Sequence, residues 1–158
     1  DGSVYAIGKL VIVTKTSSGI HLLDSRVDIA KAITKANKIA IAKPELAPYG
    51  RAAVQYLRAE GLWDHAKDKL VYADNIGAAT TYVASGAADI GFTAFSLAKS
   101  PELLKQTNYL VVDTKKYDPI KQRMVLIKAA PQEAVDLFRF MQDPQAKAIL
   151  QRYGYITP

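Results

Sequence analysis

The residues best suited to binding chemistry lie in the loop 43–53, which connects an apolar run to a strongly helical pattern. Pro48 lacks a backbone N–H and has a fixed φ, so it suits the first turn of a helix. Gly50 leaves the backbone bare just after it. The first N–H groups of a helix have no partner within it, and the helix dipole makes that end electropositive. The loop is therefore a candidate anion site, although ordinary strand-to-helix loops share this pattern.

A second loop of the same kind follows along the chain. Residues 70–73 are typical of a strand, and Asp74 or Asn75 can cap a helix that opens at Ile76. In open α/β sheets, ligands bind at the carboxyl ends of the strands. Two helix starts at one sheet edge favour an anion site more than one does, whereas Asn75 alone is explained as a plain helix cap.

Short apolar runs alternate with amphipathic segments along the whole chain. This alternation predicts a three-layer αβα fold with a mostly parallel sheet of about five strands. We expect strands at 9–14, 39–42, 70–72, 90–93, 109–113 and 123–128, and helices at 26–36, 49–60, 62–67, 76–85 and from residues 101, 131 and 144.

The composition excludes some classes of function but does not identify one. The 158 residues, 49% of them hydrophobic, suffice for one domain, or for one large lobe with a piece of another. The absence of cysteine excludes disulfides and thiolate metal sites, and no apolar run reaches membrane-spanning length. The net charge of +6 is scattered, without aromatic-basic interleaving, so we expect no nucleic-acid partner.

Residues typical of enzymes are isolated from suitable partners. His21 and His65 lack a second metal ligand at helical spacing, and Ser96 is outside any Gly-x-Ser-x-Gly elbow. There is no P-loop and no dinucleotide fingerprint. We therefore predict a binding protein and not an enzyme, with no cofactor.

Several segments together resemble the periplasmic molybdate-binding proteins of ABC transporters. The segments that carry the resemblance are 8–13, 47–53, 70–76, 88–92, 144–147 and 152–155. The resemblance implies a lobe of a type II periplasmic binding protein, and it covers the later part of the family pattern. Residues 8–128 would form the second ligand-binding lobe with its hinge strands, Gly8–Thr14 and Arg123–Lys128, side by side. Residues 129–158 would be C-terminal helices that normally pack on the first lobe, whose N-terminal part is absent.

The resemblance also implies the ligand and its site. Molybdate and tungstate are fully deprotonated near neutral pH, so a selective site needs hydrogen-bond donors alone. By position, Tyr49 and Ile76 would supply backbone N–H groups, with Gly50 and Asn75 as further candidates. A tyrosine hydroxyl that some members add falls at about Ala94 and is missing. The choice between molybdate and tungstate stays open.

Three functions remain open at this point. The first is the extracytoplasmic or periplasmic solute-binding component of an ABC importer, whose partners are the oxyanion and a membrane permease. The second is the effector-binding domain of a LysR-type transcription regulator, and the third is an enzyme of unknown class. With half a site, the chain should bind oxyanion weakly or not at all. Its C-terminal helices should fold back on the lobe or be covered in a dimer.

Overall fold

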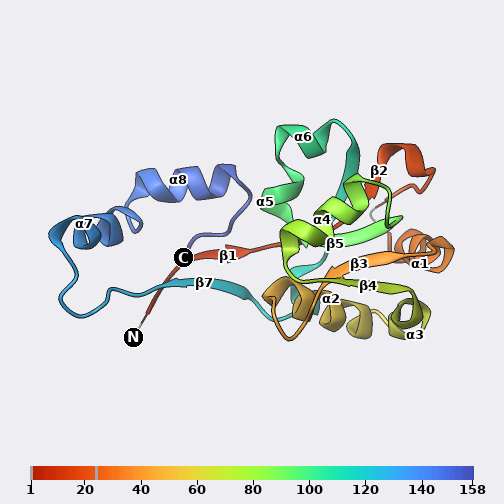
Figure 1. Ribbon diagram of the computed structural model, residues 1–158, viewed down its shortest axis with the longest axis horizontal. Coiled ribbons are helices and arrows are strands. Elements are labelled where there is room, and N and C mark those ends of the chain that lie inside the picture. The colour runs from red at the N-terminus through yellow and green to blue at the C-terminus, as the bar shows by residue number, and fades with distance from the viewer. Residues whose placement is uncertain (1, 24) are drawn as a thin grey trace.

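The computed structural model describes residues 2–23 and 25–158, which form an α/β lobe and an arm that extends from it (Figure 1). The lobe contains a five-stranded sheet in the order β4-β3-β5-β2-β6, and the two-stranded ribbon β1-β7 leads to α7 and α8. The strands are β1 Ser3–Gly8, β2 Leu10–Lys15, β3 Ile39–Ala42, β4 Leu70–Ala73, β5 Ile90–Ala94, β6 Thr107–Val111 and β7 Ile120–Met124. The helices are α1 Arg26–Lys35, α2 Pro48–Ala59, α3 Trp63–Ala66, α4 Ile76–Ala84, α5 Phe95–Ala98, α6 Pro101–Leu104, α7 Gln132–Phe140 and α8 Pro144–Arg152. Short 3₁₀ turns are η1 Thr16–Ser18, η2 Lys67–Lys69 and η3 Thr114–Lys116.

The lobe has the predicted three layers. Along β2, Leu10 and Ile12 join the core cluster formed with α1, α2 and α3, whereas Val11 and Val13 join the cluster formed with α4 and α5. All four side chains are at most 1% exposed. A strand buried on both faces reads as a continuous apolar run, which is why this pattern predicted the sheet well.

The sheet is mixed, and four of its five described strands run in the same direction, in agreement with the expected mostly parallel sheet. β3 is parallel to β4 and β5, but β2 is antiparallel to both β5 and β6. Among the described strands of this sheet, β2 therefore runs against the other four. The continuous apolar run of β2 shows burial on both faces and does not give the direction of this single strand.

The predicted pairing of Gly8–Thr14 with Arg123–Lys128 is wrong. The ribbon pairs β1 with β7, from Ser3 opposite Met124 to Gly8 opposite Ile120. β2 belongs to the main sheet, and residues 125–128 form no strand. Apolar residues 125 and 127 fit the pattern of a strand. The pairing of β1 with β7 ends at Met124, however, so β1 does not provide hydrogen-bond partners for residues 125–128.

The junction between β1 and β2 lies against two tyrosine side chains. A Cβ atom placed on Gly8 would overlap the Tyr49 hydroxyl oxygen and lie 2.9 Å from Cζ of that ring. Two residues along, the Leu10 N–H donates to the Tyr117 hydroxyl at 3.0 Å. Burial raises the pKa of Tyr49 well above its usual value, and the neighbouring hydroxyls of Tyr155, Tyr117 and Tyr5 act in the same direction.

The first turn of α2 packs directly on the end of β3. A Cβ atom on Gly50 would overlap the Ala42 carbonyl oxygen and lie 2.8 Å from its carbonyl carbon. The obstacle is backbone, which cannot rotate away as a flexible side chain can. Glycine at position 50 therefore sets how closely the helix start approaches the sheet edge.

Replacing Gly50 with alanine should destabilise the fold. We expect a loss of about 1–3 kcal/mol of unfolding free energy, measured by urea denaturation, because the helix must move away from β3. Gly77→Ala in the first turn of α4 is the matched control, since its Cβ would meet Asn75 Oδ1 at 3.3 Å and no backbone atom from outside its own helix. Equal stability of Gly50→Ala and the native chain would contradict the close packing described above.

Burial of Tyr49 should also make the fold sensitive to alkali. The folded pKa is raised, so above about pH 10 the unfolded chain releases a proton that the native state retains. Stability should then fall with rising pH, by about 1.4 kcal/mol per pH unit from this group. Tyr49→Phe should flatten that fall in denaturation curves between about pH 10 and 11. Tyr72→Phe, at a 45% exposed side chain, controls for the loss of one tyrosine, and identical slopes for Tyr49→Phe and the native chain would refute the expectation.

Candidate functional site

Two helix N-termini meet at one edge of the sheet, as the sequence predicted. β3 and β4 are parallel and in register to their last residues, with Ala42 opposite Ala73. The loops that follow are tied together, because the Lys43 N–H donates to the Ala73 carbonyl at 2.8 Å. The Lys43 ammonium also lies 2.6 Å from the Asp74 carboxylate. These contacts hold the starts of α2 and α4 in a fixed relation.

The α2 terminus leaves the Tyr49 N–H open. Pro48 is the first helical residue and has no N–H to donate. The N–H groups of Gly50 and Arg51 both donate to the Ala47 carbonyl, at 3.1 and 3.2 Å. Within residues 2–23 and 25–158, the Tyr49 N–H donates to no protein atom. Of the two α2 candidates, Tyr49 thus presents a free donor and Gly50 a donor already in use.

The α4 terminus leaves two N–H groups open. The side-chain carbonyl of Asn75 accepts from the Ala78 N–H at 2.8 Å, and its backbone carbonyl accepts from the Ala79 N–H at 3.2 Å. Asn75 therefore caps the helix. The N–H groups of Ile76 and Gly77 donate to no atom in the described part of the chain. Sequence reasoning missed Gly77, although its place two residues after the cap was the available signal.

Two of the charged groups beside this edge, Lys43 and Asp74, form an ion pair. The Asp74 carboxylate beside Lys43 raises the pKa of that ammonium, and Lys43 in turn lowers the pKa of Asp74. Both side chains are exposed, so the pair contributes little to stability. Lys43 offsets the Asp74 charge, which would otherwise repel an anion approaching the two helix starts.

No hydroxyl ends the third strand at this edge, since β5 finishes with Ala94. The hydroxyls nearby are directed inward. Buried Thr93 shares a hydrogen bond with the Thr80 hydroxyl, which also bonds the Ile76 carbonyl at 2.7 Å. These two side chains brace the first turn of α4, and the donors open at the edge are main-chain N–H groups.

The described residues show neither a metal centre nor a catalytic arrangement of histidines. No three His, Cys, Asp or Glu side chains among them gather as a group able to hold a metal ion. His65 lies in the short helix α3, whose Asp64 pairs with Lys67 at 3.1 Å. Across the described chain, no helix combines the length and apolar character required to cross a membrane.

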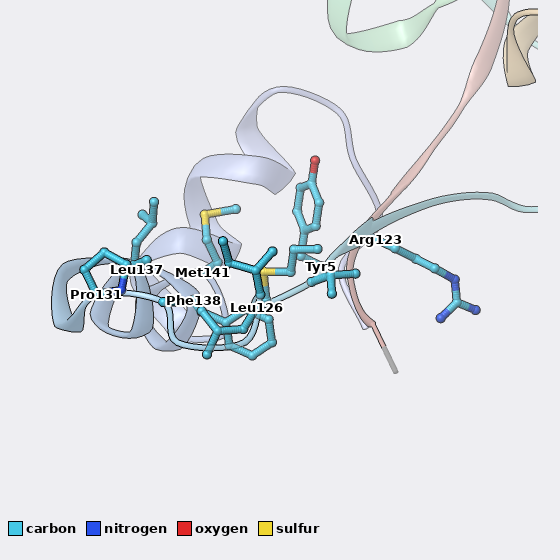
Figure 2. Close-up of a pocket in the computed structure, with 12 residues that line it drawn as sticks. Tyr5, Arg123, Leu126, Pro131, Leu137, Phe138 and Met141 are labelled. Atoms are coloured by element: carbon cyan, nitrogen blue, oxygen red, sulfur yellow. The ribbon is translucent and has the colours of Figure 1, made fainter.

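A separate apolar groove of about 480 Å³ lies on the arm, between the end of β7 and α7 (Figure 2). It shares no residue with the two helix starts. α7 contains no buried residue, and Leu137 and Phe140 are 60% and 39% exposed. The groove is lined by Tyr5, Arg123, Met124, Val125, Leu126, Ile127, Ala130, Pro131, Ala134, Leu137, Phe138 and Met141.

The end of α8 returns to the lobe, although α7 does not. The Lys99 ammonium donates to the Arg152 carbonyl at 2.8 Å, and Gly154 lies against the Phe95 ring. Ile156 bridges to Ile7 of the ribbon through two backbone hydrogen bonds. Of the two expected outcomes, folding back on the lobe is seen for the last turn of α8 and not for α7, for which coverage in a dimer stays a prediction.

Two bacterial molybdate-binding proteins are similar to this chain in sequence. The molybdate-binding protein ModA of Rhodobacter capsulatus is 34% identical over 157 residues, and that of Azotobacter vinelandii is 35% identical over 159. These matches cover 97% and 96% of this chain but 58% and 59% of the relatives. The chain thus spans less than two thirds of their length.

Solved structures agree with the sequence comparisons. The periplasmic molybdate-binding protein of Azotobacter vinelandii superposes with a TM-score of 0.79 at 33% identity, covering 99% of this chain and 68% of that one. The family model for bacterial extracellular solute-binding proteins matches residues 1–156. That is a family of binding proteins and not of enzymes, in agreement with the prediction from sequence. The chain belongs to the bacterial extracellular solute-binding proteins.

Proposed function

We propose that the chain carries one half of a binding site for a tetrahedral oxyanion, molybdate or tungstate. The observation that carries this proposal is the pair of open N–H groups, at Tyr49 and Ile76, on two helix starts held at one sheet edge. Helix N-termini favour anions through their free donors and their dipoles. Gly77 adds a third open donor beside Ile76.

The chemistry of these donors supports a fully deprotonated anion. Backbone N–H groups donate and cannot accept, so they match an ion that carries no proton of its own. Hydrogen phosphate also presents an O–H donor, which finds no unpaired acceptor among these groups. The nearby Asp74 carboxylate is engaged by Lys43. Similarity to molybdate-binding proteins points to the same ligand class.

The biological role that fits is the solute-binding component of an ABC importer, which delivers the oxyanion to a membrane permease from the periplasm or another extracytoplasmic space. Membership in an extracellular family favours this role over the effector domain of a cytoplasmic regulator. The opposing half of the site and the occupant of the apolar groove would come from a first lobe, which the greater length of the relatives provides. Residues 8–128 then serve as the second lobe, and 129–158 as helices that pack on the first.

Proline at position 76 should test the Ile76 donor directly. Ile76 is the first residue of α4, and Asn75 before it has the extended φ and ψ of −148° and 170° that proline requires of its neighbour. The substitution removes one N–H while the helix persists. We expect a loss on the order of 1–3 kcal/mol of molybdate binding free energy, the value of a charge-assisted hydrogen bond.

The measurement is a molybdate titration of the isotope-labelled chain, followed by the amide signals of Tyr49, Ile76 and Gly77. Ile76→Val retains the N–H with a similar side chain and is the matched control. In the native chain these amides should shift together, with saturation at millimolar concentrations or above, because the opposing donors are missing. Sulfate and phosphate titrations test selectivity. Unmoved amides at high molybdate, or equal affinity of Ile76→Pro and Ile76→Val, would refute this site.

The open groove on the arm should make the isolated chain self-associate. Light scattering should show dimers or larger species whose fraction rises with concentration, since apolar surface of this kind is buried on association. Leu137→Lys should reduce association without loss of unfolding free energy, because Leu137 is 60% exposed. Thr81→Lys on the lobe surface controls for added charge. A strictly monomeric chain that binds molybdate at micromolar concentration would contradict both the open groove's role and the half-site.

A further inference from the structure

We propose that Gly8 is a positioning residue for the oxyanion site, acting through the Tyr49 ring and without touching the ligand. The inference rests on the function proposed above. Tyr49 has two parts with separate tasks: its N–H is open at the α2 terminus, and its ring extends to the junction of β1 and β2. The ring fills the space that a side chain at position 8 would need.

Steric contact, and not backbone conformation, requires glycine here. The glycines with φ in the left-handed region are Gly19, Gly61, Gly86 and Gly154, and Gly8 is not among them. Its backbone is therefore open to any L-residue. A Cβ would nonetheless overlap the Tyr49 hydroxyl oxygen and approach Cζ and Cε1 to 2.9 and 3.4 Å.

Tyr49 has little freedom to avoid such a Cβ. Its side chain is 8% exposed and packs in the main core of the lobe. Movement of the α2 start toward the sheet is blocked, because Gly50 already lies against the Ala42 carbonyl. The junction on the other side is held by the hydrogen bond from the Leu10 N–H to Tyr117.

An alanine at position 8 would therefore displace the ring together with the first turn of α2. Hydrogen bonds weaken steeply as donor and acceptor lose alignment, so a small shift of the Tyr49 N–H is enough to weaken its bond to an anion. The Ile76 N–H belongs to a different helix, braced by Thr80, and should keep its place. The two donors thus respond differently to one substitution at the junction of β1 and β2.

The test compares molybdate titrations of the full chain and its variants by amide signals. Gly8→Ala should weaken binding by roughly tenfold. The molybdate-induced shift should fall at Tyr49 and persist at Ile76. Gly8→Ala combined with Tyr49→Leu should recover part of that affinity, because the ring is removed while an N–H remains at position 49. If Gly8→Ala does not fold, recovery of a folded spectrum in the double variant supports the contact equally.

Gly61→Ala is the control for lost stability. Gly61 lies just beyond the other end of α2, with φ of 70° and no atom within 4 Å of a Cβ. Alanine there is strained but touches nothing, so stability should fall while molybdate affinity stays at the native value. Native affinity in Gly8→Ala, or no recovery in the double variant, would overturn the role of Gly8. Unmoved Tyr49 and Ile76 amides in the native chain would instead overturn the proposed function itself.

Discussion

The proposed site depends on how closely the first turn of α2 packs on the end of β3. Gly50 lies against the Ala42 carbonyl, so the helix start sits directly at the sheet edge. Pro48 removes one donor, and the Ala47 carbonyl takes up the next two, which leaves the Tyr49 N–H open. A bulkier residue at position 50 would lift the whole turn and move this donor away from those of α4.

The proposed preference for a deprotonated anion rests on the kind of donors that the sheet edge presents. Main-chain N–H groups do not depend on the side chain they accompany, so an apolar isoleucine can occupy a binding position. The hydroxyls of Thr80 and Thr93 are used to brace α4, and the Asp74 carboxylate is paired with Lys43. The open groups on the two helix starts themselves are donors, at Tyr49, Ile76 and Gly77.

Local signals predicted the helix starts well, whereas features that depend on distant partners were missed. Pro48 and Asn75 mark the first turns of α2 and α4 within a few residues, and both helices begin where expected. Strand pairing is set by contacts far apart in sequence. The apolar residues 125–127 therefore looked like a strand although they lack a partner, and the true ribbon strand Ser3–Gly8 was overlooked. The reasons for glycine at positions 8 and 50 also lie in remote atoms, Tyr49 and Ala42.

The ribbon has a mechanical consequence for the molecule. The links between lobe and arm, β1, β7 and the segment at Ile156, run side by side (Figure 1). The hydrogen-bonded ribbon resists stretching and the sliding of one strand past another, because either motion breaks its ladder of hydrogen bonds. It is compliant to bending across its thin direction and to twisting. Bending of the ribbon alone would not free the arm, because the end of α8 is also held to the lobe by the hydrogen bond from Lys99 to the Arg152 carbonyl and by the packing of Gly154 on Phe95. The ribbon fixes the distance between lobe and arm, and these contacts resist the swing that the ribbon would allow.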